Sequence, residues 1–151
     1  MIVESDGLSA ITTDKNYTYL TQLLKRSFLV DPYDILSSMT NMKQFFFFHR
    51  GKPVAVVSLR DKGHLRCTGK KVSNMLYNVA THPSYRNKGY MKKLLLFLID
   101  MSKQTGKRHL HLEVLSSNKN AISLYKKLGF QVVDGCGGIE WMRLDLKKKK
   151  Q

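Results

Sequence analysis

The sequence predicts an α/β protein with a mixed central sheet and helices packed on its faces. Three observations support this. A length of 151 residues suits one domain, at ~100–200 residues per domain. A content of 42% hydrophobic and 25% charged residues is that of an ordinary globular protein. Strand-like segments also alternate with segments of helical spacing. We expect one domain over residues 1–146 and a disordered basic tail over residues 147–151.

The N-terminal part is predicted to contain one strand and two helices. Residues 8–12 resemble a short strand, and Asp14 is placed to cap the helix that follows. Asp31 and Pro32 interrupt this helix, and a second short helix is expected over residues 33–39. The apolar stripe of the first helix consists of Leu20, Leu23, Leu24 and Phe28.

Three strands are expected in the middle of the chain. The aromatic run at residues 45–48 suits a strand that is covered on both faces. A turn beginning at Gly51 leads into a second strand over residues 54–60. The third strand spans residues 76–81 and ends at His82 and Pro83.

The C-terminal half alternates between helices and strands. A helix is expected from about Gly89 to Gln104, followed by a strand over residues 109–114 and then by a helix capped by Asn118 or Asn120. Strands over residues 130–133 and 139–146 complete the sheet. The buried stripe of the first helix is Met91, Leu94, Leu95, Leu98 and Met101, and that of the second is Ala121, Leu124, Tyr125 and Leu128.

The two cysteines, Cys67 and Cys136, are too few for a disulfide framework, and we expect reduced thiols in a cytosolic protein. No group of residues has the spacing of a four-ligand zinc site, so no metal is expected. The longest apolar run, residues 94–99, is far shorter than the ~20 residues that cross a bilayer. No secretory signal is expected, since Glu4 and Asp6 stand near the N-terminus.

Charge is the most unusual feature of the composition. The chain has 26 Lys and Arg residues against 11 Asp and Glu, a net charge of +15, and setting aside the four lysines at positions 147–150 still leaves +11. Such a field favours an anionic partner and opposes polycationic substrates, although a solvated basic surface has the same composition.

The turn between the third strand and the long helix is the most informative segment. Helix N-termini present unpaired amide donors and a partial positive charge, and Gly89 lets the backbone approach a ligand. Arg86, Lys88, Lys92 and Lys93 add positive charge. On these residues alone, the turn is either a phosphate site or a tight turn with solvated basic side chains.

Two motifs resemble those of the GNAT superfamily of N-acetyltransferases. The first is Arg86-Asn87-Lys88-Gly89-Tyr90-Met91, which follows a strand and opens a helix. The second comprises Asn118, Ala121, Tyr125, Gly129 and Phe130. Met91 stands where the family usually has Gly or Ala, but its amide remains and its side chain can point into the core. The resemblance implies a mostly antiparallel sheet with helices on both faces, in a GNAT-like acyl-CoA-binding fold.

The resemblance also implies a site for acetyl-CoA as the acyl donor. The strand before the turn would diverge from its neighbour, and the backbone of Val79 and Thr81 would pair with the pantetheine arm. The amides of Asn87, Lys88, Gly89, Tyr90 and Met91 would hold the pyrophosphate, with Arg86 and Lys88 nearby. Asn118 would contact the pantetheine arm.

Tyr125 and Glu113 are the predicted catalytic residues. By resemblance, Tyr125 is the general acid that protonates the departing thiolate, although its place on an apolar stripe equally suits a core tyrosine. Glu113 is the preferred general base, and the alternative is a hydrogen-bonded strand residue. Met75 occupies another family position for the base and cannot accept a proton, so water held by Asn78 could substitute. His82 and His111 have suitable intrinsic pKa values, but His82 is expected beside the phosphate turn, away from the acceptor side.

The sequence therefore predicts an acetyl-CoA-dependent N-acetyltransferase that acts on a primary amine. Two other classes remain open, a non-catalytic acyl-CoA-binding module and a nucleic-acid-binding protein, the latter suggested only by the charge. A cytoplasmic location is expected, and the lysine tail leaves a nuclear one open. The acceptor, the length of the acyl chain and the choice between a monomer and a homodimer are not determined by the sequence.

Overall fold

A computed structural model describes residues 2–6 and 42–147 of the chain. The described strands are ordered β1-β2-β3-β4-β5-β7-β6, and the pairing of β4 with β5 is parallel whereas β1–β2, β2–β3, β5–β7 and β6–β7 are antiparallel. The predicted α/β class, with its mixed and mostly antiparallel sheet, is confirmed. None of the described helices is long and apolar enough to span a bilayer.

The chain forms two compact units, which are described separately below. The first unit combines Met1–Leu59 with Asn78–Leu95, and the second combines Arg60–Tyr77 with Leu96–Gln151. Strands β3 (Lys52–His64) and β4 (Lys71–Thr81) and helix α3 (Tyr90–Gln104) each contribute residues to both units.

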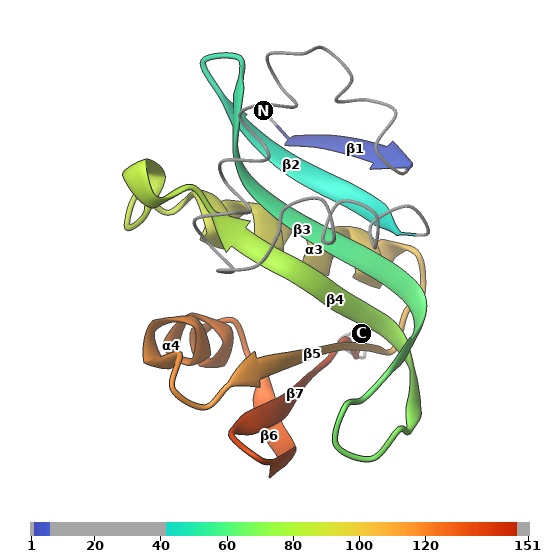
Figure 1. The fold of residues 1–151 in the computed structure, drawn as a ribbon. Helices are drawn as coiled ribbons and strands as arrows, with labels where there is room; N and C mark the ends of the chain where they lie inside the picture. The colour runs from blue at the N-terminus through green and yellow to red at the C-terminus, as the bar shows by residue number, and fades with distance from the viewer. Residues whose placement is uncertain (1, 7–41, 148–151) are drawn as a thin grey trace. The chain divides into compact units, whose positions relative to one another are not determined.

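The first unit contains β1 (Ile2–Asp6) and β2 (Lys43–His49), which pair antiparallel, with β3 on the other side of β2 (Figure 1). Phe45 and Phe46 point to opposite faces of β2, and both side chains are fully buried. The expectation of a strand covered on both faces therefore holds at this end of the aromatic run. Strand β4 ends before His82 and Pro83, as predicted, and the short helix η3 (Pro83–Tyr85) follows it.

The second unit contains β5 (His109–Leu115), helix α4 (Lys119–Lys127), β6 (Gln131–Cys136) and β7 (Ile139–Asp145) (Figure 1). One face of β5 and β7 is apolar and buried, because alternate residues of a strand share a face. Its side chains are those of Leu110, Leu112, Val114, Met142 and Leu144.

Several expectations about the elements need correction. The predicted strand at residues 8–12 and the helices up to residue 39 lie outside the described residues, and the first described strand is β1. Strands β3 and β4 are longer than predicted because their polar ends show no apolar pattern. In α4, Ile122 and Tyr125 are the buried residues, whereas Ala121, Leu124 and Leu128 are only partly buried. The nine residues of this helix are too few for a long stripe.

The expectation of two reduced thiols is also wrong, because Cys67 and Cys136 form a disulfide bond. Their Cα atoms lie 5.7 Å apart, although 69 positions separate them in the sequence. Both stand next to glycine-containing turns, Cys67 between β3 and β4 and Cys136 at the end of β6. Cysteine spacing alone does not reveal that two distant hairpin ends meet.

Candidate active site

The segment from β4 to α3 is held by hydrogen bonds from its own backbone. The His82 amide donates to the Val54 carbonyl at 2.8 Å, and the Tyr85 amide donates to the His82 carbonyl at 2.8 Å. The imidazole Nδ1 of His82 accepts a hydrogen bond from the Ser84 amide at 3.1 Å. This hydrogen bond makes His82, which is buried, the N-cap of η3.

The turn over residues 86–91 has a backbone suited to an anion. Asn87 has φ +62° and Gly89 has φ +80°, whereas Lys88 between them has no positive φ. Such alternation turns successive N–H groups toward one point. The first hydrogen bond of α3 runs from the Lys93 amide to the Gly89 carbonyl, so the amides of Tyr90 and Met91 precede the helical ladder.

The side chains of this turn take three different positions. Arg86 Nε donates to the Thr81 carbonyl at 3.3 Å. The Lys88 ammonium lies 5.5 Å from the centre of the Tyr85 ring, and both Arg86 and Lys88 are exposed. Met91 is buried, so its side chain points into the core as expected.

Aromatic side chains of β2 support the turn, which the sequence did not indicate. The hydroxyl of Tyr90 lies 3.3 Å from Nδ1 of His49, and the Tyr90 ring packs 5.0 Å from that of Phe47. Tyr85 also packs against His49, at 6.0 Å. Tyr90, predicted to bind the cofactor through its amide, is thus anchored by its side chain. The aromatic run before residue 50 was the available signal, but its partner could not be identified from it.

Strand β4 continues beyond its pairing with β5. The register pairs Met75 with His111, and β4 runs on to Thr81. Asn78 has φ +53°, which interrupts the regular pleat, and its amide Nδ2 donates to Ser58 Oγ at 3.3 Å. Val79, the next residue, is partly buried.

Glu113 is a partly buried residue of β5 with a backbone partner. Its Oε2 accepts a hydrogen bond from the Arg66 amide at 2.9 Å, and Trp141 is its neighbour on β7. Arg66 belongs to the same turn as the disulfide residue Cys67. The carboxylate therefore has a defined position in the second unit.

Helix α4 carries the two other predicted residues of this unit. Asn118 caps the helix, as its Oδ1 accepts a hydrogen bond from the Ala121 amide at 3.3 Å. Tyr125 is only 5% exposed, and its ring packs against Phe130 at 5.8 Å. Burial raises the pKa of the Tyr125 hydroxyl above its ordinary value. Within the described part of the chain, this hydroxyl has no hydrogen-bond partner.

His111 is poorly suited to act as a base. The Trp141 indole donates to His111 Nδ1 at 3.0 Å, which assigns the proton of the neutral ring to Nε2. Burial, together with His109 and the cations Arg143 and Lys70, lowers the pKa of His111 to about 4. In His82 the Nδ1 lone pair is likewise occupied.

The predicted site residues thus form two groups, one in each unit. The first group is brought together by β4 and the turn before α3, and the second by β5 and α4. In the first are Val79, Thr81, Arg86, Asn87, Lys88, Gly89, Tyr90 and Met91; in the second are Glu113, Asn118 and Tyr125. Among the described residues, no group of three or more His, Cys, Asp or Glu side chains could hold a metal ion.

Solved structures of N-acetyltransferases share this fold. The ribosomal-protein-S18-alanine N-acetyltransferase from Escherichia coli aligns with a TM-score of 0.72 at 22% identity, over 100% of this chain and 97% of that one. The PaiA N-acetyltransferase from Thermoplasma acidophilum in complex with coenzyme A aligns with a TM-score of 0.69 at 17% identity, over 96% and 99%. At these identities the likeness establishes the fold.

The family follows from the sequence itself. The model of the acetyltransferase (GNAT) family matches residues 13–130, and the chain belongs to this family. The ribosomal protein bS18-alanine N-acetyltransferase of Escherichia coli (strain K12) is 46% identical over 55 residues, which are 36% of this chain and 37% of that protein. The alignment therefore spans little more than a third of this curated relative.

Proposed function

We propose that this chain transfers the acetyl group of acetyl-CoA to a primary amine of a small molecule or a protein. The observation that carries the proposal is the turn over residues 86–91, where left-handed residues and the start of α3 present amides to an anion. Membership of the acetyltransferase family supports the same reaction.

The turn would bind the pyrophosphate through the amides of Asn87 to Met91, with charge from Arg86 and Lys88. Val79 and Thr81 would contact the pantetheine arm through their backbone. Asn118 uses its Oδ1 to cap α4, so its Nδ2 is the atom that would donate to the same arm.

In the reaction, the neutral acceptor nitrogen attacks the thioester carbonyl and the C–S bond then breaks. Tyr125 would protonate the departing sulfur. A tyrosine hydroxyl is already protonated at neutral pH, and burial raises its pKa further, so its proton would pass to the sulfur only as the C–S bond breaks. Glu113 would accept the proton of the acceptor ammonium, directly or through a water.

The name of the curated relative suggests an N-terminal alanine as the first acceptor to test. An N-terminal amine is also easier to use, because deprotonation at pH 7 costs ~1 kcal/mol, against ~4.6 kcal/mol for a lysine. The net charge of +15 favours a neutral or acidic acceptor over a polycationic one.

The proposal keeps the predicted cytoplasmic location, and the disulfide sets a condition on it. Exposed disulfides are usually reduced in the cytosol. The bond between Cys67 and Cys136 would therefore have to be one that the cytosolic reductants leave intact.

Calorimetry with acetyl-CoA and with the phosphate-free analogue acetyl-pantetheine tests the cofactor site. Acetyl-CoA should bind much more tightly than the analogue. Thiol release with a panel of peptides, small amines and antibiotics then tests transfer. Tight binding without release for any acceptor would support a binding module instead, and absence of acetyl-CoA binding would reject the proposal.

A further inference from the structure

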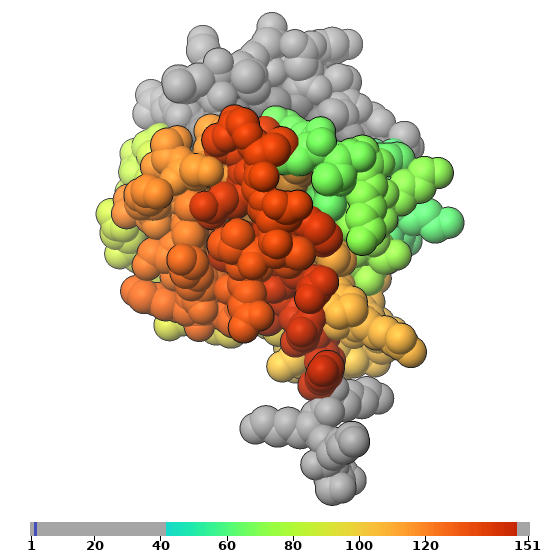
Figure 2. All heavy atoms as spheres, turned by 90° about the horizontal axis from the view of Figure 1, so that it is seen from below, coloured from blue at the N-terminus to red at the C-terminus, as the bar shows by residue number. Residues whose placement is uncertain are grey.

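A hollow of about 490 Å³ lies in the second unit, outside both groups of candidate active-site residues. It forms where the end of α3 meets the start of β5 and the end of β7. Figure 2 shows the red residues at the end of β7 beside the gold end of α3. The residues around it are Lys103, Gly106, Lys107, Arg108, His109, Leu146 and Lys147. Its volume is within the ~300–1,000 Å³ typical of small-molecule sites.

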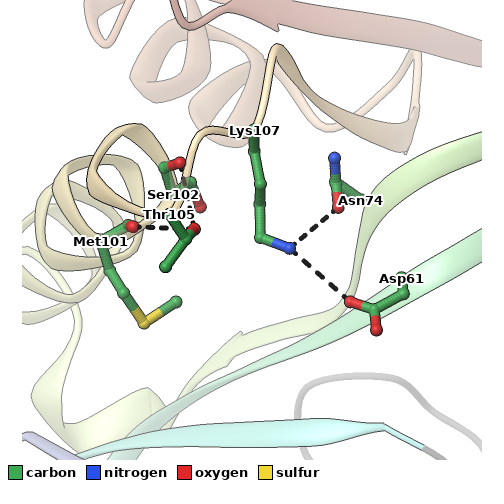
Figure 3. Close-up of polar contacts among 6 residues, drawn as sticks. All are labelled: Asp61, Asn74, Met101, Ser102, Thr105 and Lys107. Carbon is green, nitrogen blue, oxygen red and sulfur yellow. Dashed lines mark hydrogen bonds and ion pairs between the residues drawn. The ribbon is translucent and has the colours of Figure 1, made fainter.

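Backbone hydrogen bonds fix the walls of this hollow. Gly106 ends α3 with φ +77°, and the Lys107 amide donates back to the Ser102 carbonyl at 3.0 Å. The Thr105 hydroxyl donates to the Met101 carbonyl at 3.1 Å (Figure 3). On the other side, the Leu146 amide donates to the Arg108 carbonyl at 2.8 Å. The basic side chains therefore project from ordered backbone.

Four of the seven lining residues carry a positive charge, and none of the seven is acidic. Of these four cations, Lys107 has polar partners: its ammonium contacts Asn74 at 3.0 Å and Asp61 at 3.6 Å (Figure 3). His109 is paired with Asp145 at 3.1 Å. The side chains of Lys103, Arg108 and Lys147 have no hydrogen-bond or ion-pair partner among the described residues 42–147.

These three cations are not explained by the helix they adjoin. A lysine in the last turn of a helix stabilises its C-terminal carbonyls, and Lys103 can do so. Arg108 and Lys147 lie beyond the helix and lack this role. Like charges around a concave surface repel one another, and a concave wall strengthens the local field, so an anion entering the hollow is stabilised.

We propose that this hollow is a binding site for a phosphate-bearing ligand the size of a nucleotide. Phosphate suits it because the Arg108 guanidinium can bind two phosphate oxygens at once, while lysines bind as point charges. The phosphates could belong to a free nucleotide or to a nucleic-acid strand. This site does not depend on the proposed acetyl transfer.

The test uses the full chain with acetyl-CoA at saturation, so that the turn over residues 86–91 is occupied. Pyrophosphate and ADP are titrated by calorimetry into the wild type, into Lys103→Gln/Arg108→Gln and into the matched control Lys62→Gln/Lys71→Gln. The control removes two exposed charges of the same unit that do not line the hollow. We expect at least tenfold weaker binding in the first variant and less than twofold change in the control.

Equal weakening in both variants would show a general charge effect and overturn the proposal, as would absence of pyrophosphate and ADP binding to the wild type. A single-stranded RNA oligomer distinguishes the two phosphate sources. If ADP displaces the RNA and the first variant loses RNA binding, the site accepts a nucleic-acid strand; otherwise the free nucleotide is the ligand. If acetyl-CoA itself fails to bind, the turn over residues 86–91 is disabled by Arg86→Gln/Lys88→Gln instead of being saturated. Pyrophosphate binding that persists in this variant but weakens in Lys103→Gln/Arg108→Gln supports the hollow as the site. Binding that weakens in Arg86→Gln/Lys88→Gln but persists in Lys103→Gln/Arg108→Gln overturns the proposal.

Discussion

Tyr125 combines a buried ring with a hydroxyl that has no partner in the described part of the chain. Tyr125→Phe keeps the ring packing against Phe130 and removes only the hydroxyl. If the hydroxyl protonates the leaving sulfur, turnover should fall by ~10²–10⁴ while acetyl-CoA affinity barely changes. Steady-state kinetics and calorimetry on the same preparation measure both. Unchanged turnover would make Tyr125 a core residue only.

Two substitutions separate the catalytic and structural roles of Glu113. Glu113→Gln retains an oxygen that can accept the Arg66 amide but cannot act as a base, whereas Glu113→Ala loses both. If Glu113 is the catalytic base, the Gln variant should melt at the wild-type temperature but lose the low-pH limb of its pH–rate profile. The loss of rate should be larger with a lysine acceptor than with an N-terminal amine, because the lysine is harder to deprotonate. The Ala variant should also lose ~1–3 kcal/mol of stability.

The same measurements can also exclude Glu113 as the base. A Gln variant with normal turnover and an unaltered pH–rate profile would remove Glu113 from the mechanism. Water held near Asn78 would then be the next candidate for the base, although the Asn78 amide already donates to Ser58.

For single residues, the sequence predicted those roles that depend on the geometry of a few neighbouring residues. Helix rules that act over a few residues predicted a cap at Asn118 or Asn120 and an inward Met91; the structure identifies Asn118 as the cap and confirms the position of Met91. The contact between Glu113 and the Arg66 amide spans 47 positions and uses a backbone donor that any residue type would supply. No residue pattern could have indicated it.

The turn before α3 depends on a left-handed glycine. In Gly89→Ala the new methyl group would meet no atom within 4 Å, so the penalty is backbone strain at φ +80°, about 1 kcal/mol. Strain there should also shift the amides, and we expect weaker acetyl-CoA binding. Gly51→Ala is the matched control, with φ +75° and equally open surroundings in the same unit.

Both variants should lose similar stability in urea unfolding, but only Gly89→Ala should lose affinity in calorimetry. Equal affinities of Gly89→Ala and Gly51→Ala for acetyl-CoA would indicate that the turn does not hold the pyrophosphate.

The polar face of β5 and β7 makes the fold sensitive to acid. His111 has a pKa lowered from 6.5 to about 4, chiefly by burial, so between these values the unfolded chain binds a proton that the folded chain does not. The resulting stability is fully present above pH 6.5 and is lost as pH falls through about 4, by up to about 3 kcal/mol.

Urea unfolding at pH 7.5, 6 and 4.5 measures this loss. His111→Gln keeps an acceptor for the Trp141 indole and removes the titration, so its stability should vary less over this range. His64→Gln, a change at an exposed histidine, should retain the wild-type dependence. A similar slope in all three proteins would show that other groups cause the acid sensitivity.

Elements with strong periodicity were predicted well, including α3, β5 and β7. The periodicity of α4 was misread because a helix of nine residues offers few repeats, and the buried Ile122 lies between the positions of the assumed stripe. The aromatic support of the turn by His49 and Phe47 required knowledge of which strand lies beside it, which periodicity does not contain.

For the whole molecule, the disulfide is the largest single contribution that can be tested. Linking two residues 69 positions apart restricts the unfolded chain, and the chain-entropy relation gives about 4 kcal/mol for a loop of this length. Unfolding in urea should therefore show a large loss of stability in Cys67→Ser/Cys136→Ser and in the reduced wild type. Two titratable thiols in the native, unreduced protein would contradict the bond.

The same bond turns part of the chain into a covalent ring. Every candidate active-site residue, from Val79 to Tyr125, lies inside the ring closed by Cys67 and Cys136. A protease that cuts once between these cysteines opens the ring but releases neither piece, so the two fragments migrate together until a reductant is added. Nicked oxidised protein therefore keeps both groups of site residues in one covalent molecule, whereas nicked reduced protein can come apart.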